Sequence, residues 1–283
     1  MIVLEGFDSL NDAKHASETN NAPRWKWFCA PDSWNTNNNS DNDAQTEHRQ
    51  QREGRDGKWY LLTNNDNNDN NDNPTALVIY PAAKKDFWQK TYYDPLLIKD
   101  DGAFLYTTLS SKTYYTLETV FQLHAYQQFD QAGLCIRLDA HHWIKTGIEV
   151  VDKIPRLSCV VTNDYSDWST QTWSSHTNEP ASTQQQEQPH DTTETKQPII
   201  VDCQLRVHCR GSSFVVQAYF AESDSWEFIR IAHLPVLENN HSSFQAGIFA
   251  CCPEDQKGGH AIFRSVSISE GSSFDHNADG NLE

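Results

Sequence analysis

Basic residues are scarce in this 283-residue sequence, where 22 Lys and Arg stand against 39 Asp and Glu and give a formal net charge of −17. Nucleic-acid binding requires positive charge concentrated against phosphates, so this composition argues against a nucleic-acid partner. Apolar runs are short, and none approaches the roughly 20 residues of a membrane helix. The N-terminal MIVLEGFDSLNDAKHA lacks the charged and apolar regions of a signal peptide. We therefore expect a cytoplasmic protein with no membrane partner.

Recognisable metal and nucleophile motifs are missing too. The seven cysteines are odd in number and form no CxxC pair, so they predict free thiols in a reducing compartment rather than a disulfide framework. The twelve histidines form no HxxxH pattern and no quartet with cysteine. GxSxG and phosphate-cradling glycine loops are also lacking. The sequence therefore predicts no metal site and no cofactor.

Three polar tracts interrupt the chain, at residues 35–46 (NTNNNSDNDAQT), 64–73 (NNDNNDNNDN) and 174–198 (SSHTNEPASTQQQEQPHDTTETKQP), and a polar tail covers residues 275–283. Such Asn, Gln, Ser and Thr stretches bury too little apolar surface to offset the entropy of ordering, which predicts disordered insertions. The remaining roughly 220 residues are the size of one large β domain. We expect a single domain over 1–283 with these interruptions.

Alternation of apolar and polar residues dominates the rest of the sequence. The segments LCIRL, WIKTGIEVV and LSCVVTN are joined by short polar turns and predict an antiparallel meander. A second series follows the Gln-rich tract as IIVDCQLRVHC, FVVQAYFAE and WEFIRIAHL. No long segment has a period of 3.6 residues. Many short strands with frequent turns predict an all-β fold, an antiparallel β-sandwich.

One predicted strand carries charge on an unexpected side. In WIKTGIEVV, Trp143, Lys145 and Glu149 share one face, while Ile144 and Ile148 share the other. On the preceding strand, Arg137 lies opposite an apolar set, Leu134, Ile136 and Leu138. We expect both apolar sets, with Val150, to lie between the sheets. The charged residues then line the outer side, where they contribute little to the core.

Five segments occur in an order and at distances typical of one family: WKWFCAPDSW, KKDFWQKTYY, the central block 129–170, WEFIRIAHLP and AGIFACCPE. Together they resemble the regulation-of-enolase protein family, concanavalin A-like β-sandwich proteins whose mechanism is poorly understood. The block 129–170 is the most specific of the five, and the polar insertions indicate a fungal-type member. The resemblance implies a concanavalin A-like jelly roll and, through the family's name, a role in regulating enolase and carbohydrate metabolism.

The outer, concave face of such a sandwich can hold a ligand. We therefore predict a binding surface made of residues on the charged face and of neighbours implied by the resemblance, namely Trp88, Gln131, Arg137, Trp143, Lys145 and Glu149. Asp86, Tyr92, Asp167 and Trp168 are implied as further neighbours. Rings beside hydrogen-bonding charges suit a sugar or a polar peptide. The alternatives are a solvated face with cross-strand ion pairs, a turn-capping role for Asp167, and core positions for the tryptophans.

A carboxylate triplet offers a catalytic alternative. Glu222, Asp224 and Glu227 in ESDSWE match the E-x-D-x-x-E spacing of retaining glucanases with this fold, in which two carboxylates about 5–5.5 Å apart act as nucleophile and acid. Here SDS is typical of a hairpin turn, which would direct the carboxylates into water. We therefore expect a non-enzymatic cytosolic binding or regulatory protein whose partner is enolase, another cytosolic protein or a glycan. The alternative is a carbohydrate-binding module or a glucanase-like hydrolase. Whether regulation of enolase acts by contact or by expression stays open.

Overall fold

Strands form nearly all the regular structure in a computed structural model that describes residues 2–3, 25–33, 57–63, 74–173, 197–238, 241–254, 258–271 and 274. Strand β9 (Tyr115–Ala125) shows the physical basis, because every second side chain along it is buried. Within the described residues, the helical element is a single 3₁₀ turn, η2 (Pro235–Glu238). The predicted all-β class is confirmed.

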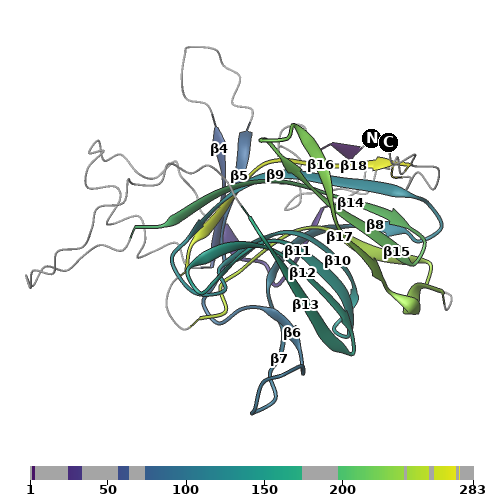
Figure 1. The fold of residues 1–283 in the computed structure, drawn as a ribbon, viewed down its shortest axis with the longest axis horizontal. Helices are drawn as coiled ribbons and strands as arrows, with labels where there is room; N and C mark the ends of the chain where they lie inside the picture. The colour runs from purple at the N-terminus through teal and green to yellow at the C-terminus, as the bar shows by residue number, and fades with distance from the viewer. Residues whose placement is uncertain are drawn as a thin grey trace, which may run out of the picture.

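Two large sheets pack face to face (Figure 1). Sheet A has nine strands in the order β16-β15-β14-β9-β18-β5-β4-β3, with β1 paired to β18. Its strands are β1 (Ile2–Val3), β3 (Asp32–Ser33), β4 (Lys58–Thr63), β5 (Pro74–Tyr80), β9 (Tyr115–Ala125), β14 (Ile199–Arg210), β15 (Ser213–Phe220), β16 (Ser225–His233) and β18 (His260–Glu270). Its described pairings are antiparallel, apart from the parallel pair β3 and β4.

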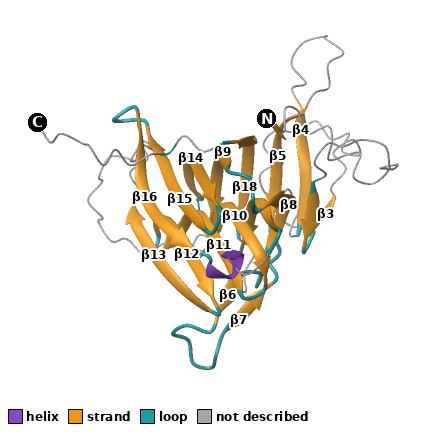
Figure 2. Ribbon diagram, turned by 90° about the vertical axis from the view of Figure 1, so that its right-hand side faces the viewer, coloured by secondary structure: helices purple, strands orange, loops and turns teal. Residues whose placement is uncertain are grey.

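Sheet B has seven strands in the order β13-β12-β11-β10-β17-β8-β2. Its strands are β2 (Lys26–Phe28), β8 (Ala103–Ser110), β10 (Gln131–Asp139), β11 (His142–Val151), β12 (Ile154–Asn163), β13 (Tyr165–Thr172) and β17 (Ser243–Cys251). A separate antiparallel pair, β6 (Phe87–Gln89) and β7 (Ile98–Asp100), lies on the side of sheet B away from sheet A (Figures 1 and 2). We call that side the outer face of sheet B.

The main core lies between the two sheets. It contains the apolar sets predicted for β10 and β11, namely Leu134, Ile136, Ile144, Ile148 and Val150, with Leu138 partly buried against them. From sheet A, Phe121 and Phe263 enter the same cluster. Each such side chain contributes about 1.5–3 kcal/mol when fully buried. This part of the sequence prediction is confirmed.

Tight turns set the register of the predicted meander, β10-β11-β12. Asp152 and Lys153 connect β11 to β12 with φ values of 52° and 65°. Two consecutive positive φ values characterise the type I′ turn, whose twist matches that of the flanking strands. The turn pairs Val151 with Ile154 and continues in register to His142 and Asn163.

Side chains join the free edges of the two sheets. Strand β13 ends sheet B and β16 ends sheet A. The Arg230 guanidinium of β16 donates to Asp167 Oδ2 at 2.9 Å and to Ser169 Oγ at 2.6 Å, both on β13. Asp167 is therefore a partner of Arg230 and not a member of the surface predicted from the resemblance.

The three polar tracts fall almost entirely outside the described residues, apart from Gln197 and Pro198, and so does the tail 275–283.

All seven cysteines are free, and six of them are buried. Burial raises the pKa of the Cys135 thiol to about 12, so this sulfur stays protonated and behaves as a small apolar group. In the part of the chain that the structure describes, no helix has the length and apolar character needed to span a membrane.

Candidate functional site

The predicted binding residues meet on the outer face of sheet B. Strand pairing sets Gln131 opposite Glu149, Cys135 opposite Lys145, and Arg137 opposite Trp143. Side chains at these positions alternate with the core residues of the same strands, so they point away from sheet A. The face is therefore a real feature of the molecule, assembled as the sequence predicts.

This face is covered by the chain itself. Residues 81–102, which include β6 and β7 and which we call the cover, lie across it (Figures 1 and 2). The Phe87 ring lies 5.9 Å from that of Trp143, and Trp88 meets Trp168 edge-on at 6.3 Å. The cover and the sheet thus enclose a second hydrophobic cluster made of Phe87, Trp88, Phe104, Cys135, Trp143, Val160, Phe249 and Cys251.

The cover returns to the sheet through one glycine. A Cβ atom at Gly102 would lie 2.4 Å from Phe87 and 2.5 Å from the sulfur of Cys251. No side chain fits there, so glycine lets the chain pass directly from the cover into β8.

The charged face was predicted to be either a solvated face or a binding surface, and the burial of its side chains overturns the first of these. Lys145 is 3% exposed, Glu149 6% and Arg137 7%, and Trp143 is fully buried. A solvated face is therefore wrong, as is the expectation that these residues contribute little to a core. The physical reason is the cover, whose three-residue strands β6 and β7 are too short to be predicted from alternation. The predicted binding role of the six residues stays a prediction.

Each buried cation pairs with a carboxylate of the cover. Lys145 Nζ lies 2.7 Å from Asp86 Oδ1. The Arg137 guanidinium donates two hydrogen bonds to Asp100, at 2.7 Å from Nη2 and 3.2 Å from Nε. The cross-strand ion pairs offered as an alternative for Arg137, Lys145 and Glu149 are thus replaced by ion pairs between sheet and cover. Removing one partner of such a buried pair typically destabilises a protein by about 3–5 kcal/mol.

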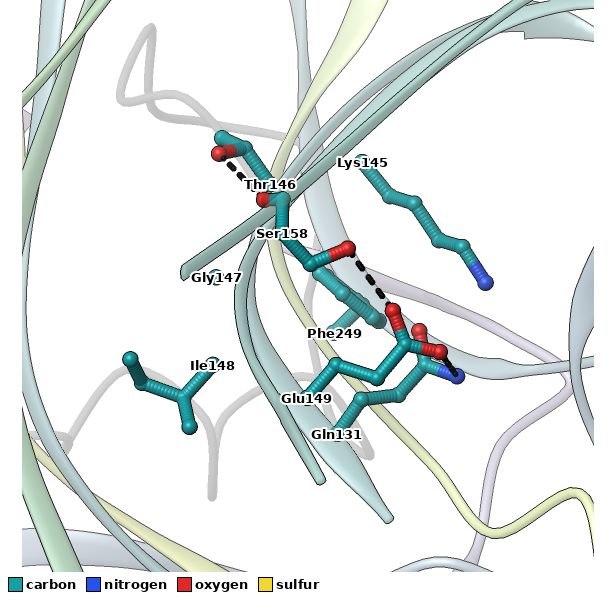
Figure 3. A pocket seen from close by; sticks show the side chains of 8 residues that line it. All are labelled: Gln131, Lys145, Thr146, Gly147, Ile148, Glu149, Ser158 and Phe249. Carbon is teal, nitrogen blue, oxygen red and sulfur yellow. Dashed lines mark hydrogen bonds between the residues drawn. The ribbon is translucent and has the colours of Figure 1, made fainter. Parts of the chain in front are cut away.

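Glu149 is a buried carboxyl group on this face, and its side chain lies beside those of Ser158 and Gln131 (Figure 3). Ser158 Oγ donates to Glu149 Oε2 at 2.7 Å, and Gln131 Nε2 lies 3.5 Å from Oε1. Burial raises the pKa of Glu149 to about 7, against the opposing effects of Lys145 and Ser158. Burial alone would lower the pKa of Lys145, but the Asp86 and Glu149 carboxylates outweigh it and raise that pKa.

A carboxyl group with a pKa near 7 is suited to proton transfer, provided that a substrate can reach it. The hollow beside Glu149 has no room for even a water molecule. It is lined by Gln131, Lys145, Thr146, Gly147, Ile148, Glu149, Ser158 and Phe249 (Figure 3). In this closed arrangement the polar groups hold the cover and meet no substrate.

The carboxylate triplet lies elsewhere, at the hairpin between β15 and β16. Glu222 and Asp224 belong to the turn and Glu227 to the first residues of β16, and all three are exposed. Asp224 adopts a positive φ of 49° and accepts a hydrogen bond from the Tyr219 hydroxyl, while Ser223 Oγ donates to Glu227 at 3.3 Å. The predicted hairpin turn is confirmed.

Some further residues at the covered face were predicted from the sequence, and others were not. Trp88 and Asp86 of the cover and Trp168 of β13 lie at the covered face, whereas Tyr92 projects outward from the tip of the cover. Asp100, Phe87 and Ser158 were missed. Ser158 had a signal, because it alternates with Leu157 and Cys159 on the polar side of its strand. Among the described residues, no three His, Cys, Asp or Glu side chains group closely enough to hold a metal ion.

Comparison with known proteins places the chain in a family. The family model described as "Protein of unknown function (DUF1349)" matches residues 62–271. The chain belongs to this family. Regulation of enolase protein 1 of Saccharomyces cerevisiae is 30% identical over 171 residues, which cover 60% of this chain and 70% of the yeast protein. The recognition made from the five segments is thereby confirmed.

Solved structures agree on the fold. A functionally unknown protein from Saccharomyces cerevisiae has a TM-score of 0.53 and 26% identity, over 76% of this chain and 96% of that one. A xylan beta-1,4-xylosidase from Bacillus halodurans C-125 has a TM-score of 0.50 and 10% identity, over 71% of this chain and 34% of the enzyme. At that identity the second likeness concerns the sandwich architecture alone.

Proposed function

We propose that this protein is a non-enzymatic binding and regulatory protein that acts in the cytosol by direct contact with a protein partner, for which enolase is the candidate. The observation that carries the proposal is the cover. It fills the sheet face that would otherwise hold a small ligand, and it buries the charged groups in ion pairs of 2.7 Å. A molecule built in this way offers its outer surface to a partner rather than a cleft to a substrate.

Two further observations support the proposal. The yeast relative carries the name Regulation of enolase protein 1, and that name makes enolase the candidate partner proposed for this chain. The carboxylate triplet of the hydrolase alternative is exposed at the hairpin between β15 and β16, whereas paired carboxylates act on a glycoside within a cleft.

The test combines binding and activity. Purified protein is titrated into purified enolase from the same organism in a calorimeter, and enolase turnover is followed over the same concentrations. We expect a saturable complex and a change in turnover. An absence of both at micromolar concentrations would contradict regulation by contact.

The hydrolase alternative is examined with the same preparation. We expect no release of reducing sugar from xylan or a β-glucan, because Glu222 lies in an exposed turn and Glu227 lies exposed near the start of β16. Cleavage that disappears in Glu222→Gln and persists in Glu118→Gln, a carboxylate on sheet A away from the turn, would replace the binding proposal with a hydrolase.

A further inference from the structure

Lys145 and Asp86 hold an amine and a carboxyl group in contact beneath the cover. Lys145 Nζ lies 2.7 Å from Asp86 Oδ1, and the two side chains are 3% and 12% exposed. A nitrogen hydrogen-bonded to a carboxylate oxygen lies about 3–3.5 Å from the carboxyl carbon, which is the separation of two reacting atoms just before a bond forms. The pair therefore has the geometry for amide formation as well as for ion pairing.

Apolar rings surround this pair. Phe87, next to Asp86 in the chain, is fully buried, and the Trp143 ring lies 5.9 Å from Lys145 Nζ. The hollow beside the pair is lined by Phe249 and has no room for a water molecule. Loss of hydration disfavours ammonium and carboxylate relative to the neutral amine and acid, the forms that react with each other. A dry site also protects an amide from hydrolysis.

Glu149 sets the number of protons in this site. Burial raises the pKa of Glu149 to about 7, so its carboxyl is neutral in a large share of the molecules at neutral pH. Burial opposes the charge of Lys145, but the Asp86 and Glu149 carboxylates outweigh it and raise the pKa of Lys145. When Glu149 is neutral, a proton can pass from Lys145 to Asp86 without leaving a buried charge behind. When Glu149 is ionised, the same transfer would leave its carboxylate buried and unpaired.

Gln131 supplies a hydrogen-bond donor at the reacting carboxyl. Its Nε2 lies 3.3 Å from Asp86 Oδ1 and 3.5 Å from Glu149 Oε1. The dashed line between Gln131 and Glu149 in Figure 3 marks the second of these contacts. A donor at Oδ1 stabilises the negative charge that develops on this oxygen when a nucleophile adds to the carboxyl carbon.

We propose that Lys145 and Asp86 condense into an intramolecular amide bond that ties the cover to β11. Nζ bonds to Asp86 Cγ, and the bond between Cγ and Oδ2 breaks. Oδ1 carries the negative charge of the intermediate and remains as the amide oxygen. Both protons of the released water come from the Lys145 ammonium, so the step needs no cofactor, oxidant or reductant. The product joins residues 59 positions apart, whatever partner the protein binds.

Two other ion pairs of the cover lack the features that this reaction needs. Arg137 pairs with Asp100, but a guanidinium stays protonated in proteins and does not act as the nucleophile. Lys85 Nζ lies 3.1 Å from Asp101 Oδ2, and these side chains are 45% and 30% exposed, so water keeps both groups charged. We therefore expect condensation between Lys145 and Asp86 and not at either of these pairs.

The groups around Glu149 and Lys145 determine the pH range of the reaction. Charged or titratable groups reach this site from four elements: Lys145 on β11, Arg156 opposite Glu149 on β12, Asp86 and Tyr93 on the cover, and Cys251 on β17. With a pKa of about 7, the neutral fraction of Glu149 falls from about 0.9 at pH 6 to about 0.1 at pH 8. Bond formation should therefore slow about tenfold between these pH values.

Intact mass and peptide mapping of the denatured full chain test the bond. We expect the parent to weigh less than its sequence by one water. Trypsin should release residues 86–90 joined to residues 138–153, with no cleavage after Lys145. Lys145→Arg keeps the charge but cannot form the bond, so it should have its full mass. Lys85→Arg, at the exposed pair, is the matched control and should lose one water as the parent does.

Refolding measures the part played by Glu149. Chains isolated unfolded from inclusion bodies are refolded at pH 6 and at pH 8, and the loss of water is followed by mass. We expect the parent to react about tenfold more slowly at pH 8. Glu149→Gln is neutral at both pH values and should react equally fast at both. A parent rate that is the same at pH 6 and pH 8 would overturn the role assigned to Glu149.

Two results would overturn the bond itself. One is a parent chain that keeps its full mass after prolonged incubation at pH 6. The other is a loss of water that persists in Lys145→Arg or maps to an Asp-Gly sequence such as Asp101-Gly102, where aspartate can cyclise onto the backbone. Should Lys145→Arg fail to fold, the peptide map of the parent decides alone.

Discussion

Among single residues, Glu149 gives the clearest link between burial and pH. Its carboxyl ionises near pH 4.5 when exposed and near pH 7 in the folded protein. Between these values the folded state holds a proton that the unfolded state has released. Stability therefore falls as the pH rises from about 4.5 to about 7, and the loss remains constant above that range.

Glu149→Gln should remove this dependence. Relative to the parent, the variant should gain on the order of 2 kcal/mol in free energy of unfolding between pH 5 and pH 8, because each pKa unit corresponds to about 1.4 kcal/mol. Urea unfolding at several pH values measures the difference in free energy of unfolding between variant and parent. Glu227→Gln, at an exposed site, serves as the control. A difference that does not change with pH would show that the pKa of Glu149 is not raised, and that Lys145 and Ser158 offset its burial.

At the scale of an element, the cover depends on Phe87. This ring is fully buried against Trp143 and Gly102. Phe87→Ala should lower the free energy of unfolding by about 3–5 kcal/mol, the usual loss for a large ring deleted from a core. Hydrogen exchange should quicken first within residues 81–102. A loss below about 1 kcal/mol would mean that the cover packs loosely and that the face beneath it can open.

The cover also marks where prediction from the sequence ended. Alternation in WIKTGIEVV correctly separated Lys145 and Glu149 from Ile144 and Ile148, because the two-residue period of a strand is local. The partner of Lys145 cannot be read from nearby sequence, since Asp86 is 59 residues away along the chain. It also lies on a segment whose strands have only three residues. The sequence therefore predicted the members of the charged face but not that the chain buries them. Asp100 was missed for the same reason.

For the whole molecule, the two strand series predicted the sandwich, because hairpin-connected strands need only short-range pairing. The assignment of β17 and β18 to different sheets depends on long-range packing that no local pattern specifies. The three polar tracts supply a prediction at this scale. Replacing 35–46, 64–73 and 174–198 by short Gly-Ser linkers should leave the melting temperature within a few degrees, since long polar loops add little closure entropy.

Calorimetry on the shortened chain measures this effect. Removal of 64–73 requires a linker long enough to keep Thr63 paired with Pro74 at the end of β4 and β5. A fall of more than about ten degrees after any single replacement would show that the corresponding tract packs on the sandwich.

The order of the cover and its sheet along the chain has a consequence for biosynthesis. Phe87 and Trp88 leave the ribosome before β11, β12 and β13, the strands that they finally contact. About 80 residues separate Trp88 from Trp168, and translation at about 5–20 residues per second needs on the order of 4–16 s to add them. Until β11 and β13 have been made, the nascent chain carries Phe87, Trp88 and Asp86 without Trp143, Trp168 and Lys145, the partners that they finally contact. Newly made protein should therefore be most dependent on chaperones during this window, and slower translation between codons 90 and 168 should lengthen it.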